Sequence, residues 1–205
     1  MHQPRRIRPT VILRHVLPYS ERTTVSHERH VDRPKLLQAV TDILEAIGED
    51  PQREGLRETP RRVADMYIEM FEGLDINPTD HIDSAIFDEP SAGDLVTVGN
   101  IWFDSMCEHH LLPFRGTAEI SYEPSSGRVV GLSKLARVVE VVSRRPQVQE
   151  RMTQQILSAI AESSLKPAGV KVSIEAEHMC MSVRGVRQNG AKTYTTGTWG
   201  TLRSN

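Results

Sequence analysis

The first third of the chain carries a helical pattern of hydrophobic positions. In residues 34–47, apolar side chains recur at spacings of three and four, which predicts an amphipathic helix that ends at Gly48. A second helix is expected to begin with Thr59 as its N-cap and Pro60 at the first helical position, and to end at Gly73. The residues expected to face inward are Leu36, Leu37, Val40, Ile43, Leu44 and Ile47 in the first helix, and Val63, Met66, Tyr67 and Met70 in the second.

From Asp94 onward the hydrophobic period changes to two, which is typical of half-buried strands. Two helical stretches interrupt this pattern, one capped by Ser133 and one opened by Pro146. The dipeptide Asn189-Gly190 is a strong hairpin signal. The order of helices, two strands, two helices and two strands predicts an α+β fold with a four-stranded, largely antiparallel sheet. The expected strands are 95–103, 118–123, 170–180 and 192–198, and the two helices extend to Val142 and Ile160.

Composition divides the chain into three regions. Residues 1–34 contain seven arginines against three acidic residues and show no hydrophobic periodicity, so we expect a disordered basic N-terminal arm. An organelle transit peptide is the alternative, although acidic residues are unusual in one. Residues 35–93 form an N-terminal helical region in which 74–93 is an irregular connection, and residues 94–205 form the sheet-containing domain.

Charge and hydropathy argue against several kinds of partner. The 205-residue chain has a net charge of −2, which gives no overall reason to expect binding to nucleic acid. It contains no apolar run near the ~18 residues of a membrane span. It also shows no signal-peptide pattern. We therefore expect a cytoplasmic protein that binds neither membranes nor nucleic acid.

Both cysteines of the chain lie beside histidines. Cys107 precedes His109 and His110, and Cys180 follows His178 by two residues. The spacing of Cys107 and His110 allows one turn to bind a metal ion, and Cys180 would complete a Cys2His set. Three protein ligands with an open fourth position are typical of a catalytic zinc, beside which His109 and His178 become candidate proton carriers. In the predicted strand, His178 and Cys180 point to the same side, about 7 Å apart.

Three other roles for the cysteines stay open. A disulfide is one, although thiols remain reduced inside cells. Burial as small apolar side chains is another, since that is the usual fate of a free cysteine. The third is a closed structural metal site with His109 or His178 as its fourth ligand.

Polar residues near these segments are candidates for substrate binding. Lys134 and Arg137 lie early in a predicted helix whose N-terminus adds free N–H groups and a positive dipole. With Arg184 they would suit a polyphosphate, whereas the ordinary role of each is on a solvated surface. Glu150 could accept two hydrogen bonds from an N–H/NH2 edge, which guanine has and adenine lacks. Its ordinary role is to complement a helix dipole.

At these residues the chain resembles GTP cyclohydrolase I. The resemblance runs in the family's order from about residue 35 to 202. The family has Gly-Lys where this chain has Gly116-Thr117, and often Phe where it has Leu202. The segments that carry the resemblance are 107–114, 131–137, 145–151, 178–181 with 184–186, and the stretch 47–63 in the N-terminal region.

The resemblance implies a role for each candidate residue. The zinc ligands would be Cys107, His110 and Cys180, and His109 and His178 would serve proton transfer. Gln149 and Glu150 would hold the guanine ring of GTP. The residues implied for the triphosphate are Ser133, Lys134, Arg137 and Arg184, with Arg62 donated from a neighbouring subunit.

The resemblance also implies a fold, an assembly and a reaction. Residues 94–205 would be a catalytic domain with the tunnelling fold, in which four-stranded sheets join edge to edge into a five-subunit barrel. Two barrels stack into a decamer, so active sites lie between subunits of a pentamer or decamer and the sheet edges are covered. The implied reaction converts GTP and water to 7,8-dihydroneopterin triphosphate and formate, with a zinc-activated water adding at C8.

Two other classes of protein compete with this expectation. A zinc nucleobase deaminase uses the same activated water, but its His-x-Glu and Pro-Cys-x-x-Cys motifs do not occur in the chain. A non-catalytic module with a structural metal would unfold when the metal is removed. The expected enzyme would stay assembled and lose only its activity.

Overall fold

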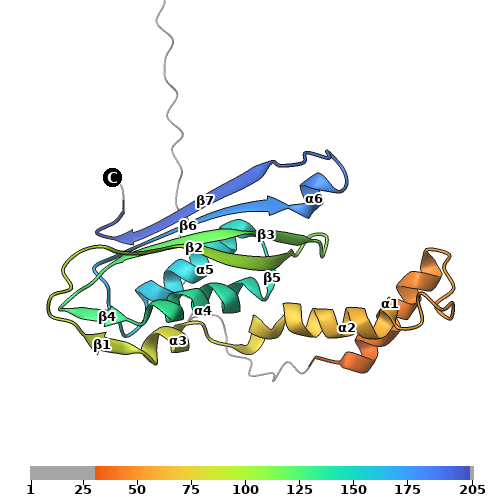
Figure 1. The fold of residues 1–205 in the computed structure, drawn as a ribbon, viewed down its shortest axis with the longest axis horizontal. Coiled ribbons are helices and arrows are strands. Elements are labelled where there is room, and N and C mark those ends of the chain that lie inside the picture. The colour runs from red at the N-terminus through yellow and green to blue at the C-terminus, as the bar shows by residue number, and fades with distance from the viewer. Residues whose placement is uncertain (1–30, 204–205) are drawn as a thin grey trace, which may run out of the picture.

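The computed structural model describes residues 31–203, so most of the predicted N-terminal arm lies outside the described residues. The predicted helices and long strands occur in the predicted order, with further short elements between them, and the α+β class is confirmed. In Figure 1 a twisted sheet lies over two helices, and two N-terminal helices extend away from this body. None of the helices in residues 31–203 combines the length and apolar character that crossing a membrane requires.

The central sheet contains five strands in the order β5-β2-β3-β6-β7. The four long strands pair antiparallel as predicted, whereas the short β5 runs parallel to the end of β2. The prediction that Pro146 opens a helix is wrong, because Pro146 begins β5, where an edge strand tolerates its missing N–H. The strands are β2 (Val96–Cys107), β3 (Pro113–Glu123), β5 (Pro146–Gln147), β6 (Gly169–His178) and β7 (Lys192–Gly200).

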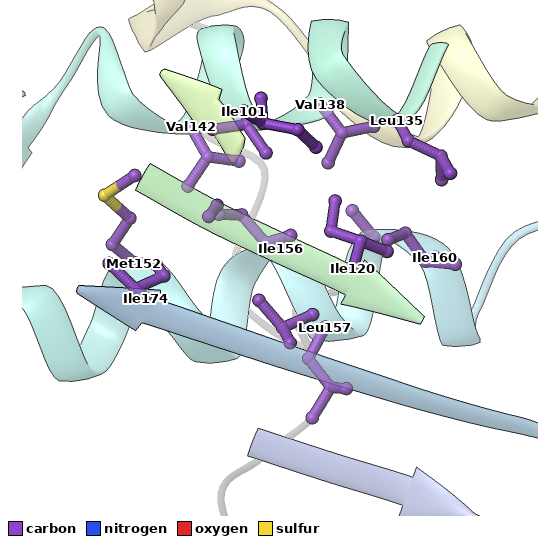
Figure 2. Packing of buried hydrophobic residues seen from close by; sticks show 14 of the residues in the cluster. Ile101, Ile120, Leu135, Val138, Val142, Met152, Ile156, Leu157, Ile160 and Ile174 are labelled. Atoms are coloured by element: carbon purple, nitrogen blue, oxygen red, sulfur yellow. The ribbon is translucent and has the colours of Figure 1, made fainter. Parts of the chain in front are cut away.

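Helices α4 (Leu132–Ser143) and α5 (Gln149–Ala161) cover one face of the sheet and form the core with it, as Figure 2 shows. The two helices predicted within the strand pattern are confirmed, and both lie against the sheet. The prediction that Ser133 caps α4 is wrong, since Gly131 holds the N-cap position and Ser133 lies in the first turn. The core side chains include Leu135, Val138, Val139 and Val142 of α4, Met152, Ile156 and Ile160 of α5, and Ile120 and Ile174 of the sheet.

Helices α1 (Arg33–Ala46) and α2 (Thr59–Met70) pack against each other, but they bury less than predicted. The exposed fraction is 60% for Ile43, 69% for Ile47 and 43% for Met66, although all three were expected to face inward. Thr59 is the first helical residue, and Glu58 takes the N-cap position expected for Thr59. This helical pair therefore presents apolar surface that a single chain leaves open to solvent.

Segment 74–93 is more regular than the predicted irregular connection. It includes the end of the 3-10 helix η2 (Glu72–Asp75), helix α3 (Thr79–Asp83) and strand β1 (Ile86–Asp88), which pairs with β4 (Arg128–Val130). These elements are too short to produce a clear hydrophobic period. The buried Arg145 holds the segment to the sheet domain, because its guanidinium donates to the backbone oxygens of Gly73 at 2.8 Å and Ile76 at 2.7 Å.

Candidate functional site

Three of the predicted site residues converge at one end of the sheet. One ligand atom each from Cys107, His110 and Cys180 lies within 4.8 Å of the others, and we call these three residues the ligand group. Cys107 ends β2, His110 follows in the next turn, and Cys180 lies just beyond β6. Strands β2 and β6 both pair antiparallel with β3, which lies between them, so they run in the same direction. Their carboxyl ends therefore reach the same edge of the sheet, where the two cysteines meet.

The position of Cys180 corrects a prediction. We expected a strand through residue 180, with His178 and Cys180 on one side, but β6 ends at His178 and Cys180 lies in the helical turn α6 (Met179–Ser182). The pairing of β6 with β3 ends at Phe114 and His178, near the first residue of β3. Beyond that point the backbone bonds locally, with the Val183 N–H donating to Met179 O at 3.0 Å.

Backbone contacts shape the ligand turn, residues 107–112, that carries two members of the ligand group. The Leu111 N–H donates to Cys107 O at 2.8 Å, and the Cys107 N–H donates to Leu112 O at 2.9 Å. Within the turn, the Glu108 N–H donates to Gln147 O of β5 at 3.0 Å. The Arg151 guanidinium donates to the Glu108 carboxylate, and this bond lowers the pKa of Glu108. The turn is therefore tied to β5 and α5.

The chemistry of the ligand group fits a metal ion. Both cysteines are free thiols, so the structure does not contain the disulfide that the sequence left open. Burial, and then the neighbouring Cys107, raise the pKa of Cys180, and Arg184 partly offsets this effect. A divalent cation would stabilise the two thiolates that otherwise disfavour each other. Two sulfurs and an imidazole nitrogen are ligands that soft or borderline metal ions prefer.

The two predicted proton carriers lie outside the ligand group. His178 is half-buried and stacks on Phe114, with ring centroids 4.4 Å apart and planes inclined by 4°. Burial lowers the pKa of His178, and the negative charge of Glu150 partly offsets this shift. His109 is more exposed, with its Nδ1 3.9 Å from the Cys107 sulfur. Neither histidine occupies the position of a fourth ligand in this arrangement.

The two predicted guanine contacts occupy different environments. The Gln149 side chain is 1% exposed, and its amide nitrogen contacts Ile174 O at 3.2 Å, Thr193 O at 3.1 Å and Thr195 Oγ1 at 3.1 Å. Its amide oxygen lies 2.8 Å from His178 Nε2. Glu150 is exposed in the first turn of α5 and lies near enough to His178 to influence it electrostatically.

The predicted triphosphate residues are only partly brought together. Arg184 Nη1 lies 3.3 Å from His110 Nε2, beside the ligand group. Ser133 and Arg137 line a groove of about 570 Å³ on another part of the surface, and Arg137 pairs with Glu140 at 2.5 Å. No member of the ligand group lines this groove. The remaining predicted residues are Lys134, half-buried on α4, and Arg62, exposed on α2.

Sequence patterns did not single out two residues that contact the site. Phe114 stacks on His178, and Arg151 holds Glu108 in the ligand turn. Phe114 lies next to Pro113, where β3 begins, and its partner in β6 depends on the register of two distant strands. Arg151 looks like an ordinary surface cation in its helix. The contacts of both residues depend on segments that are far apart in the sequence, and such contacts leave no local signal.

Together the fold and the ligand group define an α+β protein in which a Cys2His group that fits a metal ion lies at one end of the sheet, with two further histidines nearby. The sequence model of the family described as GTP cyclohydrolase I matches residues 36–205. The chain belongs to the GTP cyclohydrolase I family.

Curated relatives named GTP cyclohydrolase 1 support this assignment. The relative from Streptococcus mutans is 58% identical over 164 residues, which cover 80% of this chain and 84% of the relative. The relative from Bacillus subtilis is 54% identical over 175 residues, covering 85% and 90%. Among solved structures, an archaeosine synthase QueF-Like in the apo form has a TM-score of 0.43 and 16% identity, covering 53% of this chain and 96% of that one.

Proposed function

We propose that this chain is a zinc-dependent GTP cyclohydrolase I, which converts GTP and water to 7,8-dihydroneopterin triphosphate and formate. The convergence of Cys107, His110 and Cys180 carries the proposal, because two distant cysteines and a histidine meet in a chain of this family. Zinc held there would act as a Lewis acid and make water nucleophilic at neutral pH. The two sulfurs and one nitrogen match zinc, and three protein ligands leave a position open.

Residues beside the ligand group would handle protons and the base. His109 would donate a proton to N7 of guanine as the imidazole ring of the base opens, since its exposed ring lies beside Cys107. His178 would move protons in the later steps that reclose the ring as a pterin. Glu150 would accept N1–H and the 2-amino group of guanine, a charge-assisted pair that adenine cannot make. Gln149, predicted as a second guanine contact, has its side-chain amide engaged by the protein itself.

The triphosphate would be held between subunits. Arg184 lies beside the ligand group, whereas Ser133 and Arg137 line a groove that contains none of its members. A complete site would therefore combine the ligand group of one subunit with the α4 residues Ser133, Lys134 and Arg137 of another. Arg62 of α2 is a further candidate from a neighbouring chain.

Exposed aromatic residues on both outer long strands support this assembly. The exposed fraction is 77% for Trp102 of β2, 68% for Tyr194 and 42% for Trp199 of β7. Within residues 31–203, β7 has no partner on its outer side and β2 has only the two-residue β5. Edge-to-edge joining of such sheets into the five-subunit barrel of the tunnelling fold would cover these edges and aromatic rings.

The apolar surface of α1 and α2 is a second candidate contact between subunits, so we propose a homo-oligomer, a pentamer or decamer. We also keep the division into a basic arm (1–34), a helical region (35–93) and a catalytic domain (94–205). The cytoplasm is the proposed location.

The test is turnover of GTP by the purified, zinc-loaded full chain. Formate and a fluorescent pterin should appear in equal amounts, and ATP should give neither product. His109→Ala should keep its zinc and lose formate release, whereas His110→Ala should lose both. Equal loss of zinc from the two variants would mean that the roles of ligand and acid are exchanged. Unfolding of the chain on zinc removal, together with no turnover of GTP, would favour a structural metal module.

A further inference from the structure

We infer that Gln149 is a positioning residue that fixes the neutral imidazole of His178 in the tautomer with its proton on Nε2. Nδ1 is then the atom through which His178 accepts and returns a proton. The inference deepens the proposed function and rests on it, because it assumes that His178 carries protons in the reaction. It departs from the expectation that the Gln149 side chain holds the guanine ring.

The orientation of the Gln149 amide follows from its partners. Its nitrogen lies 3.2 Å from Ile174 O and 3.1 Å from Thr193 O, and a backbone carbonyl can only accept a hydrogen bond. Rotating the amide by 180° would place its oxygen against these two carbonyl oxygens, neither of which can donate a hydrogen bond to it. The network therefore assigns the NH2 group to this side and the amide oxygen to the side of His178.

The tautomer of His178 follows in turn. The Gln149 Oε1 atom lies 2.8 Å from His178 Nε2 and can only accept, so Nε2 must carry the hydrogen. In a neutral imidazole the other nitrogen, Nδ1, then holds the lone pair. The parallel stack on Phe114, with ring centroids 4.4 Å apart, keeps the plane of the imidazole aligned with this contact.

The amide is also held too firmly to follow a substrate. It is 1% exposed, and its acceptors lie on both β6 and β7. Thr195 Oγ1, a third partner at 3.1 Å, is itself 2.7 Å from Thr153 Oγ1, which donates to the backbone oxygen of Gln149 at 2.9 Å. Moving the side chain toward a base would break this network. The neighbouring Glu150 is exposed and has no such constraint.

The tautomer can be measured directly in the resting full-length protein. Solid-state NMR of the zinc-loaded chain with 15N-labelled histidine separates protonated from unprotonated ring nitrogens, and His178→Asn identifies the signals of His178. The expected result is a protonated Nε2 and an unprotonated Nδ1, with this preference lost in Gln149→Met. A protonated Nδ1 in the wild type would overturn the inference. This measurement needs no turnover, so its failure is distinct from a failure of the wild type to convert GTP.

Kinetics separate positioning from substrate binding. Gln149→Met should lower kcat by about 10- to 100-fold, a part of what general acid–base catalysis contributes, with less than about a threefold change in KM for GTP. Thr195→Val is the matched control, because it removes one partner of the same amide and leaves both backbone acceptors, so its kcat should stay within about twofold of the wild type. A raised KM with an unchanged kcat in Gln149→Met would assign the side chain to guanine and overturn the inference.

Discussion

Replacing Arg151 with methionine tests how the ligand turn is held for the metal. The Arg151 guanidinium donates to the Glu108 carboxylate, to Pro146 O at 3.1 Å and to Gln147 Oε1 at 3.3 Å. Glu108 lies between two members of the ligand group in sequence, so these bonds tie the turn to β5 and α5. Methionine keeps most of the aliphatic volume and removes every donor. We expect Arg151→Met to fold and to bind zinc more weakly.

The size of the effect can be worked out from the contacts. A hydrogen bond to a charged group contributes about 1.5–3 kcal/mol when buried. Both side chains of this pair are 34% exposed, and solvent screening reduces the contribution to roughly 1 kcal/mol. The two longer bonds to neutral acceptors add about 0.5 kcal/mol each. If most of this roughly 2 kcal/mol serves to order the turn, zinc affinity should fall about 10- to 30-fold.

The assay is equilibrium competition for zinc between the protein and a chromophoric chelator of known affinity, with circular dichroism as a check on folding. Arg115→Met is the matched control, since it removes an exposed ion pair with Asp104 at 2.9 Å in the same sheet. This control should bind zinc like the wild type. The reasoning fails if Arg151→Met keeps wild-type affinity, or if the two variants lose affinity equally.

Three further predictions concern the ligand group, the base and the sheet. Cys180→Ser should retain no zinc in metal analysis after dialysis, because it leaves one sulfur and one nitrogen; full zinc content and activity would contradict the ligand group. Glu150→Gln should lower turnover of GTP by at least roughly 30-fold at unchanged zinc content, and unimpaired turnover by the variant would refute this contact. Inosine triphosphate, which lacks the 2-amino group, should be a poor substrate of the wild type. Gly116→Ala should lower the free energy of unfolding by about 1–3 kcal/mol, since the added Cβ would lie 1.9 Å from Glu175 O. Gly99→Ala is the control and should melt like the wild type, because the atom nearest to its added Cβ would be 3.6 Å away.

The sequence predicted the parts of the fold that follow from local periodicity. Helix α4 and the four long antiparallel strands match the structure because each repeats its hydrophobic signal over several residues. Strand β5 and helices α3 and α6 are only two to five residues long, and they were missed. Cys180 shows the consequence: the alternation of β6 was extended two residues too far, because the end of its pairing partner β3 is not visible in local sequence.

The candidate site was predicted as a set of residues, and its internal arrangement was not. Spacing identified Cys107, His110 and Cys180 because the chain has only two cysteines and both lie beside histidines. Glutamine is a common residue, and the role of the Gln149 side chain depends on which hydrogen-bond acceptors surround it.

Two backbone carbonyls from different strands face the Gln149 amide nitrogen, and they alone determine that its oxygen meets His178. A sequence can therefore indicate which histidine is near a metal, whereas the nitrogen that carries its proton is determined by the pairing of β6 and β7. If the tautomer of His178 in the resting protein determines which nitrogen exchanges a proton with the substrate, the pairing of β6 and β7 contributes to catalysis as well as to the fold.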